Sequence, residues 1–196
     1  MSDTPIDVFI DLPSFPGPVQ AGRLWSHFRK GRESASFEYN KEWLANPHRF
    51  ALEPLLPLAD GTFHTNPGQS VFGAIGDSTP DRWGRILMRR AELARARTAN
   101  ESPHTLSELD YLLRVNDEAR QGALRFSQDG GQSFCAPPGS TPIPPLVNLS
   151  RLLHAADHFC RDDENAEDLR LLLAPGSSLG GARPKASVKD KKGNLC

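Results

Sequence analysis

Short strand-like runs of hydrophobic and polar residues occupy the first forty positions of the chain. They are Ile6–Asp11, Gly22–Phe28 and Ala35–Tyr39, and turn-forming residues separate them. In the second and third runs, apolar and polar residues alternate with a period of two, which is typical of strands with one buried face. We therefore expect a small antiparallel sheet here. Prolines and glycines from Leu52 to Gly76 favour irregular loops with short strands.

Helical spacing replaces this alternation from Asp77 onward. In residues 77–81, an N-cap candidate followed by Pro80 near the first turn opens a helix that runs to about Arg97. The capping box at residues 105–108 opens a second helix that stops before Gly122. Two further amphipathic helices follow Asn148, and the second of them ends at Gly176. The apolar faces expected to be buried are Trp83, Ile86, Leu87, Leu93 and Ala94; Leu109, Leu112 and Leu113; Leu149, Leu152, Leu153, Ala156, Phe159 and Cys160; and Leu169, Leu172 and Leu173.

These patterns predict an α+β protein in three parts. Residues 1–126 form an N-terminal subdomain with an antiparallel sheet and packed helices, residues 127–147 form a linker or loop rich in proline, glycine and serine, and residues 148–196 form a helical pair with a glycine-rich segment. The stretch Ala186–Lys189 predicts a strand that enters a turn at residues 190–193. Little sequence follows this turn, so we expect the chain to stop in the middle of an element.

Composition narrows the functional classes. The formal net charge is −1 over 196 residues, so contact with a nucleic acid requires a local patch of positive charge, and a histone-like binder is excluded. The N-terminus is acidic where a signal peptide is basic, and Pro54 and Pro57 interrupt the apolar stretch 51–59. The chain contains three cysteines without CxxC spacing, which suggests reduced thiols. We expect a cytoplasmic protein without a membrane segment.

The segment Gly176–Lys185 has the residue types of a phosphate-binding loop. Its glycines and serines leave backbone N–H groups free for an anion, and Arg183 and Lys185 add positive charge. A Walker motif is excluded, because Ala182 stands where lysine is required. A helix C-cap followed by a glycine turn explains the same residues. The segment also matches the nucleophile elbow G-x-S-x-G, but no histidine follows His158, which argues against a serine hydrolase.

Two other groups of residues could carry chemistry. His154 and His158 have a spacing that can bind one metal ion from a helix, but no third ligand with matching spacing is apparent, so we expect a solvated face and no metal site. Arg82, Arg85 and Arg89 form a basic stripe that could bind phosphates or an acidic partner. An exposed arginine-rich surface is the simpler interpretation.

Five blocks of residues stand out along the chain: Phe37–Tyr39 with Glu42–Leu44, Ala51–Leu58, Gly76–Arg85, Gln121–Leu124 and Ser177–Lys185. They occur in the order seen in HipA-type toxin kinases, and the chain resembles that family. Together they span most of the chain, which makes the resemblance specific, whereas the glycine-rich block alone would be a weak match.

The resemblance implies a serine/threonine kinase of a bacterial type II toxin–antitoxin system. In this family a small N-terminal subdomain precedes a kinase-like fold, and a glycine-rich loop covers the phosphates of ATP. Transferred residue by residue, the loop would comprise Leu179, Gly180, Gly181, Ala182 and Arg183 with Lys185 beside them, and Ser178 would be the autophosphorylation candidate. The implied partners are a HipB-like helix-turn-helix antitoxin, with operator DNA bound only indirectly, or a complementary kinase polypeptide. Family substrates include the glutamyl-tRNA synthetase.

The catalytic set of a kinase is missing from this sequence. Phosphoryl transfer needs a lysine on the strand after the glycine loop, an aspartate that accepts the substrate proton, and acidic or amide ligands for magnesium. Few residues follow Gly181, and Lys189 falls earlier than the nucleotide lysine of the family pattern. We therefore expect the opening of a protein-kinase-like N-lobe, truncated, with no catalytic residues. ATP with Mg would bind only if a catalytic lobe completed the site.

Three hypotheses follow. The first is that the chain is the N-terminal segment of a HipA-like kinase and is inactive alone. The second is a non-catalytic module that docks on a separate HipA-like kinase or antitoxin. The third, an independent nucleotide-binding enzyme, lacks acids and bases at usable positions.

Overall fold

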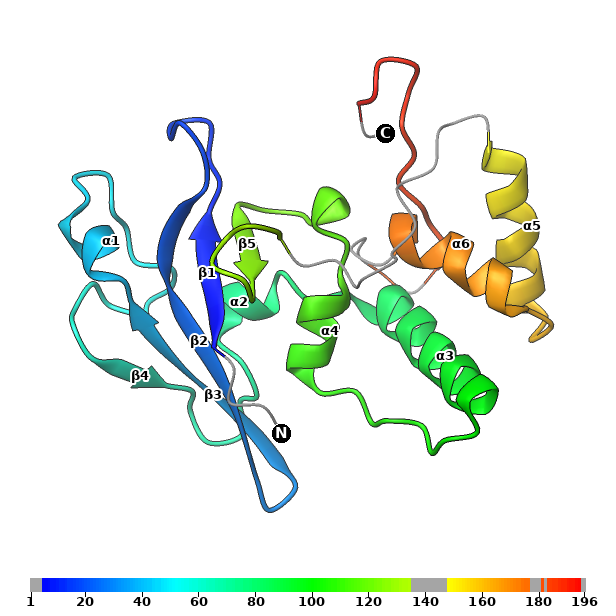
Figure 1. Ribbon diagram of the computed structural model, residues 1–196, viewed down its shortest axis with the longest axis horizontal. Coiled ribbons are helices and arrows are strands. Elements are labelled where there is room, and N and C mark those ends of the chain that lie inside the picture. Colours follow the sequence, from blue (N-terminus) through cyan, green and yellow to red (C-terminus); the bar gives the residue numbers. More distant parts are fainter. Residues whose placement is uncertain (1–4, 135–147, 177–180, 182, 195–196) are drawn as a thin grey trace. The chain divides into compact units, whose positions relative to one another are not determined.

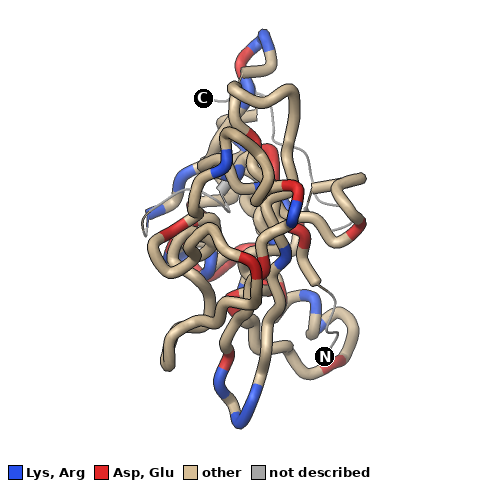
Figure 2. Tube along the Cα trace, turned by 90° about the vertical axis from the view of Figure 1, so that its left-hand side faces the viewer, with Lys and Arg blue, Asp and Glu red and all other residues tan. Residues whose placement is uncertain are grey.

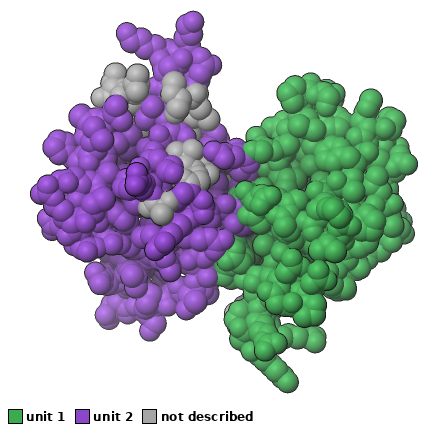
Figure 3. All heavy atoms as spheres, turned by 180° about the vertical axis from the view of Figure 1, so that it is seen from behind, with its two compact units in different colours: residues 1–78, 107–109, 122–135 green, residues 79–106, 110–121, 136–196 purple. Residues whose placement is uncertain are grey.

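The computed structural model describes residues 5–134, 148–176, 181 and 183–194. The chain divides into two compact units (Figure 3). Unit 1 comprises residues 1–78, 107–109 and 122–135, and unit 2 comprises residues 79–106, 110–121 and 136–196. Each unit is described by itself below.

Unit 1 is built on a five-stranded antiparallel sheet (Figure 1). Its strands are β1 (Ile6–Ile10), β2 (Val19–Arg29), β3 (Arg32–Tyr39), β4 (Thr62–His64) and β5 (Leu124–Ser127), and their order across the sheet is β4-β3-β2-β1-β5. The three runs identified near the N-terminus are therefore strands, and the expectation of an antiparallel sheet is confirmed. The short β4 lies within the segment from Leu52 to Gly76, where prolines and glycines predicted irregular loops with short strands.

A glycine on β2 permits the close approach of β3. A Cβ atom at Gly22 would lie 2.2 Å from the backbone oxygen of Glu38 and 2.5 Å from the ring of Phe37, so no other residue fits without moving the neighbouring strand. The register between β1 and β2 shifts at Val8 and Phe9, opposite this position. Gly22 and the adjacent bulge thus fix how the central strands meet.

Aromatic and aliphatic side chains form the core of unit 1. Trp43 of α1 (Lys41–Ala45) is fully buried, and its ring meets those of Phe15 and Phe50 edge to face. The other fully buried side chains include Ile6, Ile10, Leu24, Phe37, Leu56, Phe72, Ile75 and Phe126. Phe72 and Ile75 lie at the short α2 (Gly73–Gly76), so the loop-rich segment contributes two side chains to the core.

Unit 2 is mainly helical. Its helices are α3 (Arg82–Ala99), α5 (Leu149–Cys160), α6 (Ala166–Gly176) and most of α4 (Glu108–Arg114), and a 3-10 turn, η1, spans Asp117–Ala119. One cluster of buried side chains joins α3, α5 and α6: Trp83, Leu87, Leu152, Ala155, Phe159, Leu169, Leu172 and Val188. A second cluster contains Met88, Tyr111 and Val115. Among the described residues, no helix is both long enough and apolar enough to cross a membrane.

Several expectations about the helices are wrong in detail. The helix after Asp77 begins at Arg82, with Asp81 as N-cap, because Pro80 lies outside it. The capping box at residues 105–108 does not form, and α4 begins only at Glu108. Leu93 and Cys160 are exposed. Leu149 and Leu153 of α5 are also exposed, at 45% and 63%, because the buried stripe of α5 follows Leu152, Ala155 and Phe159.

Candidate functional site

The N-terminus of α3 organises the candidate site. Asp81 has extended backbone geometry, and its side chain accepts a hydrogen bond from the backbone N–H of Arg82 at 2.9 Å, as an N-cap residue does. Thr79 and Pro80, which precede Asp81, are held by Arg85. Its guanidinium donates to the carbonyl of Pro80 at 2.8 Å and to the hydroxyl of Thr79 at 3.1 Å. The approach to the helix is therefore held by side chains of its own first turn.

The described part of the glycine-rich segment lies against this helix end. The N–H of Gly181 donates to the second carboxylate oxygen of Asp81 at 2.5 Å, and the carbonyl of Gly181 accepts from the backbone N–H of Trp83 at 2.9 Å. The indole N–H of Trp83 donates to the carbonyl of Lys185 at 3.2 Å. Residues about one hundred positions apart in the chain are thus joined by hydrogen bonds inside unit 2.

These contacts favour the charged form of the Asp81 carboxylate. The pKa of Asp81 is lowered, first by the hydrogen bond from the Gly181 N–H, then by that from Arg82, with the nearby cations Lys185 and Arg85 contributing. Gly181 has a φ of +94°, and a Cβ there would lie 2.6 Å from the Lys185 ammonium nitrogen. The Lys185 side chain therefore folds back onto Gly181.

The chain after the segment is fixed to unit 2 as well. The N–H of Ser187 donates to the carbonyl of Pro175 at 2.8 Å, and Val188 is buried in the cluster formed by α3, α5 and α6. Lys189 forms an ion pair with Glu118. The predicted turn at residues 190–193 forms, whereas the strand expected before it is reduced to a single bridge residue at Lys189. Gly181 to Lys189 thus has anchors at both ends.

The structure brings together only some of the residues predicted to form the loop. Gly181 and Lys185 meet at the N-terminus of α3, and Arg183 is exposed. Ser178, Leu179, Gly180 and Ala182 lie outside the described residues. Sequence reasoning gave Asp81 and Trp83 no role at the loop. The signal for Asp81 was an aspartate at a helix start, and Trp83 was recognised only as part of a buried helix face.

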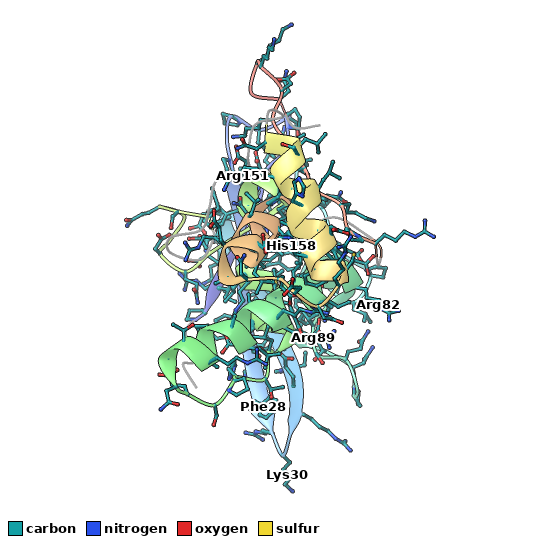
Figure 4. The ribbon with its side chains drawn as sticks, turned by 90° about the vertical axis from the view of Figure 1, so that its right-hand side faces the viewer. Phe28, Lys30, Arg82, Arg89, Arg151 and His158 are labelled. Carbon is teal, nitrogen blue, oxygen red and sulfur yellow. The ribbon has the colours of Figure 1, made fainter. Side chains whose placement is uncertain are left out.

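The basic stripe divides into two kinds of arginine. Arg82 and Arg89 are exposed (Figure 4). Arg85 instead binds Pro80 and Thr79, and its guanidinium lies 4.7 Å from the centre of the Tyr111 ring. Arg85 therefore stabilises the start of α3 and is not part of an exposed stripe.

One of the two histidines on α5 is paired with a carboxylate of the neighbouring helix. Nδ1 of His158 lies 3.0 Å from a carboxylate oxygen of Asp168 on α6, and this hydrogen bond raises the pKa of His158. Within the described ranges, no group of three or more His, Cys, Asp or Glu residues could hold a metal ion. His158 is therefore best understood as one half of an ion pair between two helices when it is protonated.

The described residues define an α+β protein with a five-stranded antiparallel sheet and a helix terminus that holds part of a glycine-rich segment. The family model of the HipA N-terminal domain matches residues 17–127. The chain belongs to this family and is therefore a HipA-like, toxin–antitoxin-related protein. No curated protein matches the chain.

Proposed function

We propose that this chain supplies the N-terminal part of a HipA-like serine/threonine kinase, in which the glycine-rich segment covers the phosphates of ATP. The observation that carries the proposal is the placement of Gly181 and Lys185 on the N-terminus of α3 in a chain of the HipA family. Because α3 begins inside the family match and the segment lies outside it, the family domain would serve as the support of the loop.

The described residues fit a phosphate group in part. Gly181 offers a backbone N–H, the Lys185 ammonium lies beside it, and Arg183 is exposed nearby in the chain. That N–H is bonded to the Asp81 carboxylate, so a phosphate could use it only by displacing an anion of the protein itself. Magnesium ligands of the kinase type would have to come from elsewhere, since no acidic cluster suited to a metal occurs among the described residues.

The 196-residue polypeptide alone is therefore proposed not to transfer phosphate. The proton-accepting aspartate, the nucleotide lysine and the magnesium ligands would be supplied by a catalytic lobe, whether in further sequence or in a second polypeptide. A HipB-like helix-turn-helix antitoxin remains the proposed regulatory partner, and Ser178 the proposed autophosphorylation site. These assignments rest on membership of the family and not on contacts of this chain.

The test measures binding of a fluorescent ATP analogue with magnesium to the chain, to a HipA-like catalytic lobe, and to both together. We expect tight binding only to the combination. Gly181→Ala places a side chain at a φ of +94°, and it should weaken binding of the ATP analogue to the combination about tenfold or more. Gly193→Ala is the matched control, because Gly193 has a φ of +85° and lies in the turn at residues 190–193.

Two outcomes would contradict the proposal. If Gly181→Ala binds the analogue as well as the unmodified chain does, the segment does not cover the phosphates. If the chain binds the lobe while nucleotide affinity stays the same with and without it, the chain is a docking module, which is the alternative function.

A further inference from the structure

The hairpin of β2 and β3 extends beyond the rest of the sheet of unit 1. β1 pairs with β2 only as far as Leu24, whereas β2 and β3 remain paired to Arg29 and Arg32. β4 pairs with β3 only from Ser36 to Glu38. Residues 27–34 therefore form a two-stranded arm that pairs with neither β1 nor β4, and the arm is visible below the sheet in Figure 1.

The tip of this arm carries a concentration of positive charge. Arg29, Lys30 and Arg32 are exposed, and none of them has an ion pair with any residue in the described part of the chain. Figure 2 shows the basic residues gathered at the end of the hairpin. Since the formal net charge of the chain is −1, this patch is a local feature and does not reflect a generally basic protein.

Glu33, the acidic residue that follows Arg32 in the chain, already has hydrogen-bond partners within the fold. The carboxylate of Glu33 accepts hydrogen bonds from the backbone N–H groups of Glu108 at 2.9 Å and Leu109 at 3.2 Å, where α4 begins. It also accepts one from the hydroxyl of Ser26 at 3.3 Å. Its charge is thus oriented toward the helix start, which leaves the three cations of the tip available to an external anion.

Alternation along the strands sorts the side chains of the arm. Arg29 and Arg32 are cross-strand partners and share one face with His27 and Trp25. Phe28 lies on the opposite face and is 51% exposed, although it is a large apolar residue. Figure 4 shows Phe28 next to the tip and Lys30 at its end. A narrow two-stranded ribbon with cations at its end suits the major groove of a DNA duplex, whose edges are lined by phosphates.

We propose that the β2–β3 arm binds duplex DNA, with Arg29, Lys30 and Arg32 on backbone phosphates and the ribbon in the major groove. The major groove of B-form DNA admits a two-stranded ribbon, whereas the major groove of an RNA duplex is too narrow for side chains to read. This inference does not depend on the proposed kinase function, because it concerns a different surface and unit 1 alone.

The test is fluorescence anisotropy of the full chain with a labelled DNA duplex of about two helical turns, from about 50 to about 200 mM salt. The variant R29Q/K30N/R32Q removes the three charges. Asparagine is chosen for Lys30 because its φ is +49° and Gly31 follows at +74°, a turn that Asn-Gly favours. R82Q/R89Q/R97Q is the matched control, since it removes three exposed charges from α3.

The arm variant should bind at least about tenfold more weakly at low salt. The slope of log K against log salt should fall by roughly 2 to 3, because each phosphate contact contributes about 0.9. The affinity of the control variant for the DNA duplex should stay within about twofold of that of the unmodified chain. Both variants should have the same midpoint of thermal unfolding as the unmodified chain. If the arm variant does not, R29Q and R32Q are measured singly, and each should change the slope of log K against log salt by about 0.9.

Three results would overturn the proposal. One is an arm variant with unchanged affinity. Another is an equal loss in the control variant, which would mean that only total charge matters. The third is binding to an RNA duplex, a single strand or polyglutamate as tight as binding to the DNA duplex, because the arm would then be a general site for polyanions or acidic proteins.

Discussion

Replacing Glu92 with glutamine should destabilise unit 2 at neutral pH and do so less in acid. Glu92 lies on α3 with only 3% of its side chain exposed, and its carboxylate binds Arg95 at 2.8 Å and Arg114 at 3.1 Å. It also accepts the backbone N–H of His104 at 3.2 Å. The carboxylate therefore joins α3, the segment that follows it and α4.

The expected loss of stability in Glu92→Gln follows from the pKa of the Glu92 carboxyl group. Hydrogen bonds from Arg95 are the largest cause that lowers the pKa of Glu92, from its ordinary 4.5 to about 2. Each pKa unit is worth about 1.4 kcal/mol, so the charged form contributes about 3 kcal/mol at neutral pH. Arg95 and Arg114 are 50% and 31% exposed and can regain water, so Glu92→Gln should cost about 2–3 kcal/mol.

Urea denaturation at a series of pH values provides the assay. Because the pKa is lower in the folded state, this stabilisation is complete above about 4.5 and is lost as the pH falls toward about 2. The difference between the unmodified chain and Glu92→Gln should therefore shrink over that range. Glu167→Gln is the control, since Glu167 is 75% exposed and its ion pair with Arg151 should contribute less than about 1 kcal/mol. Equal stability of the chain and Glu92→Gln at pH 7, or a gap that persists in acid, would refute this reasoning.

Three further predictions concern other parts of the chain. Tyr39→Phe removes a buried hydroxyl that donates to one backbone group and accepts from another, and should cost about 1–3 kcal/mol in the free energy of unfolding by urea. Trp83→Phe removes the indole N–H bound to Lys185, so amide hydrogen exchange should become faster at residues 181–189 and stay unchanged in β1; uniform acceleration would indicate general destabilisation instead. The pKa of His158, measured by NMR, should lie above 6.5 and fall in Asp168→Asn; its stabilising effect is present at acidic pH and lost as the pH rises through that raised value.

Local patterns predicted the regular elements well. The bounds of α5 agree with the spacing that predicted a helix at residues 149–160, and the alternating runs form β2 and β3. In these segments, periodicity reports burial directly, because one face of each element packs against a core. The prediction that Leu149 and Leu153 are buried was wrong. Apolar residues flank the buried stripe of α5 on both sides, and only the packing partners decide which of them are buried.

Contacts between distant residues could not be predicted. The N-terminal N–H groups of α4 are capped by Glu33 of β3, so the capping box in the local sequence was not needed. Asp81 was recognisable as a helix-start residue, but its second oxygen binds Gly181, about one hundred positions away. Local chemistry indicates which groups can bond, and the tertiary fold selects their partners.

The most direct test of the central claim measures phosphate transfer from radiolabelled ATP. The 196-residue chain, free of contaminating kinases, should transfer no label to itself or to a protein substrate. Added to a HipA-like catalytic lobe, it should support transfer that Gly181→Ala lowers about tenfold or more and Gly193→Ala leaves intact. Transfer by the chain alone, or transfer with the lobe that does not depend on Gly181, would contradict the account.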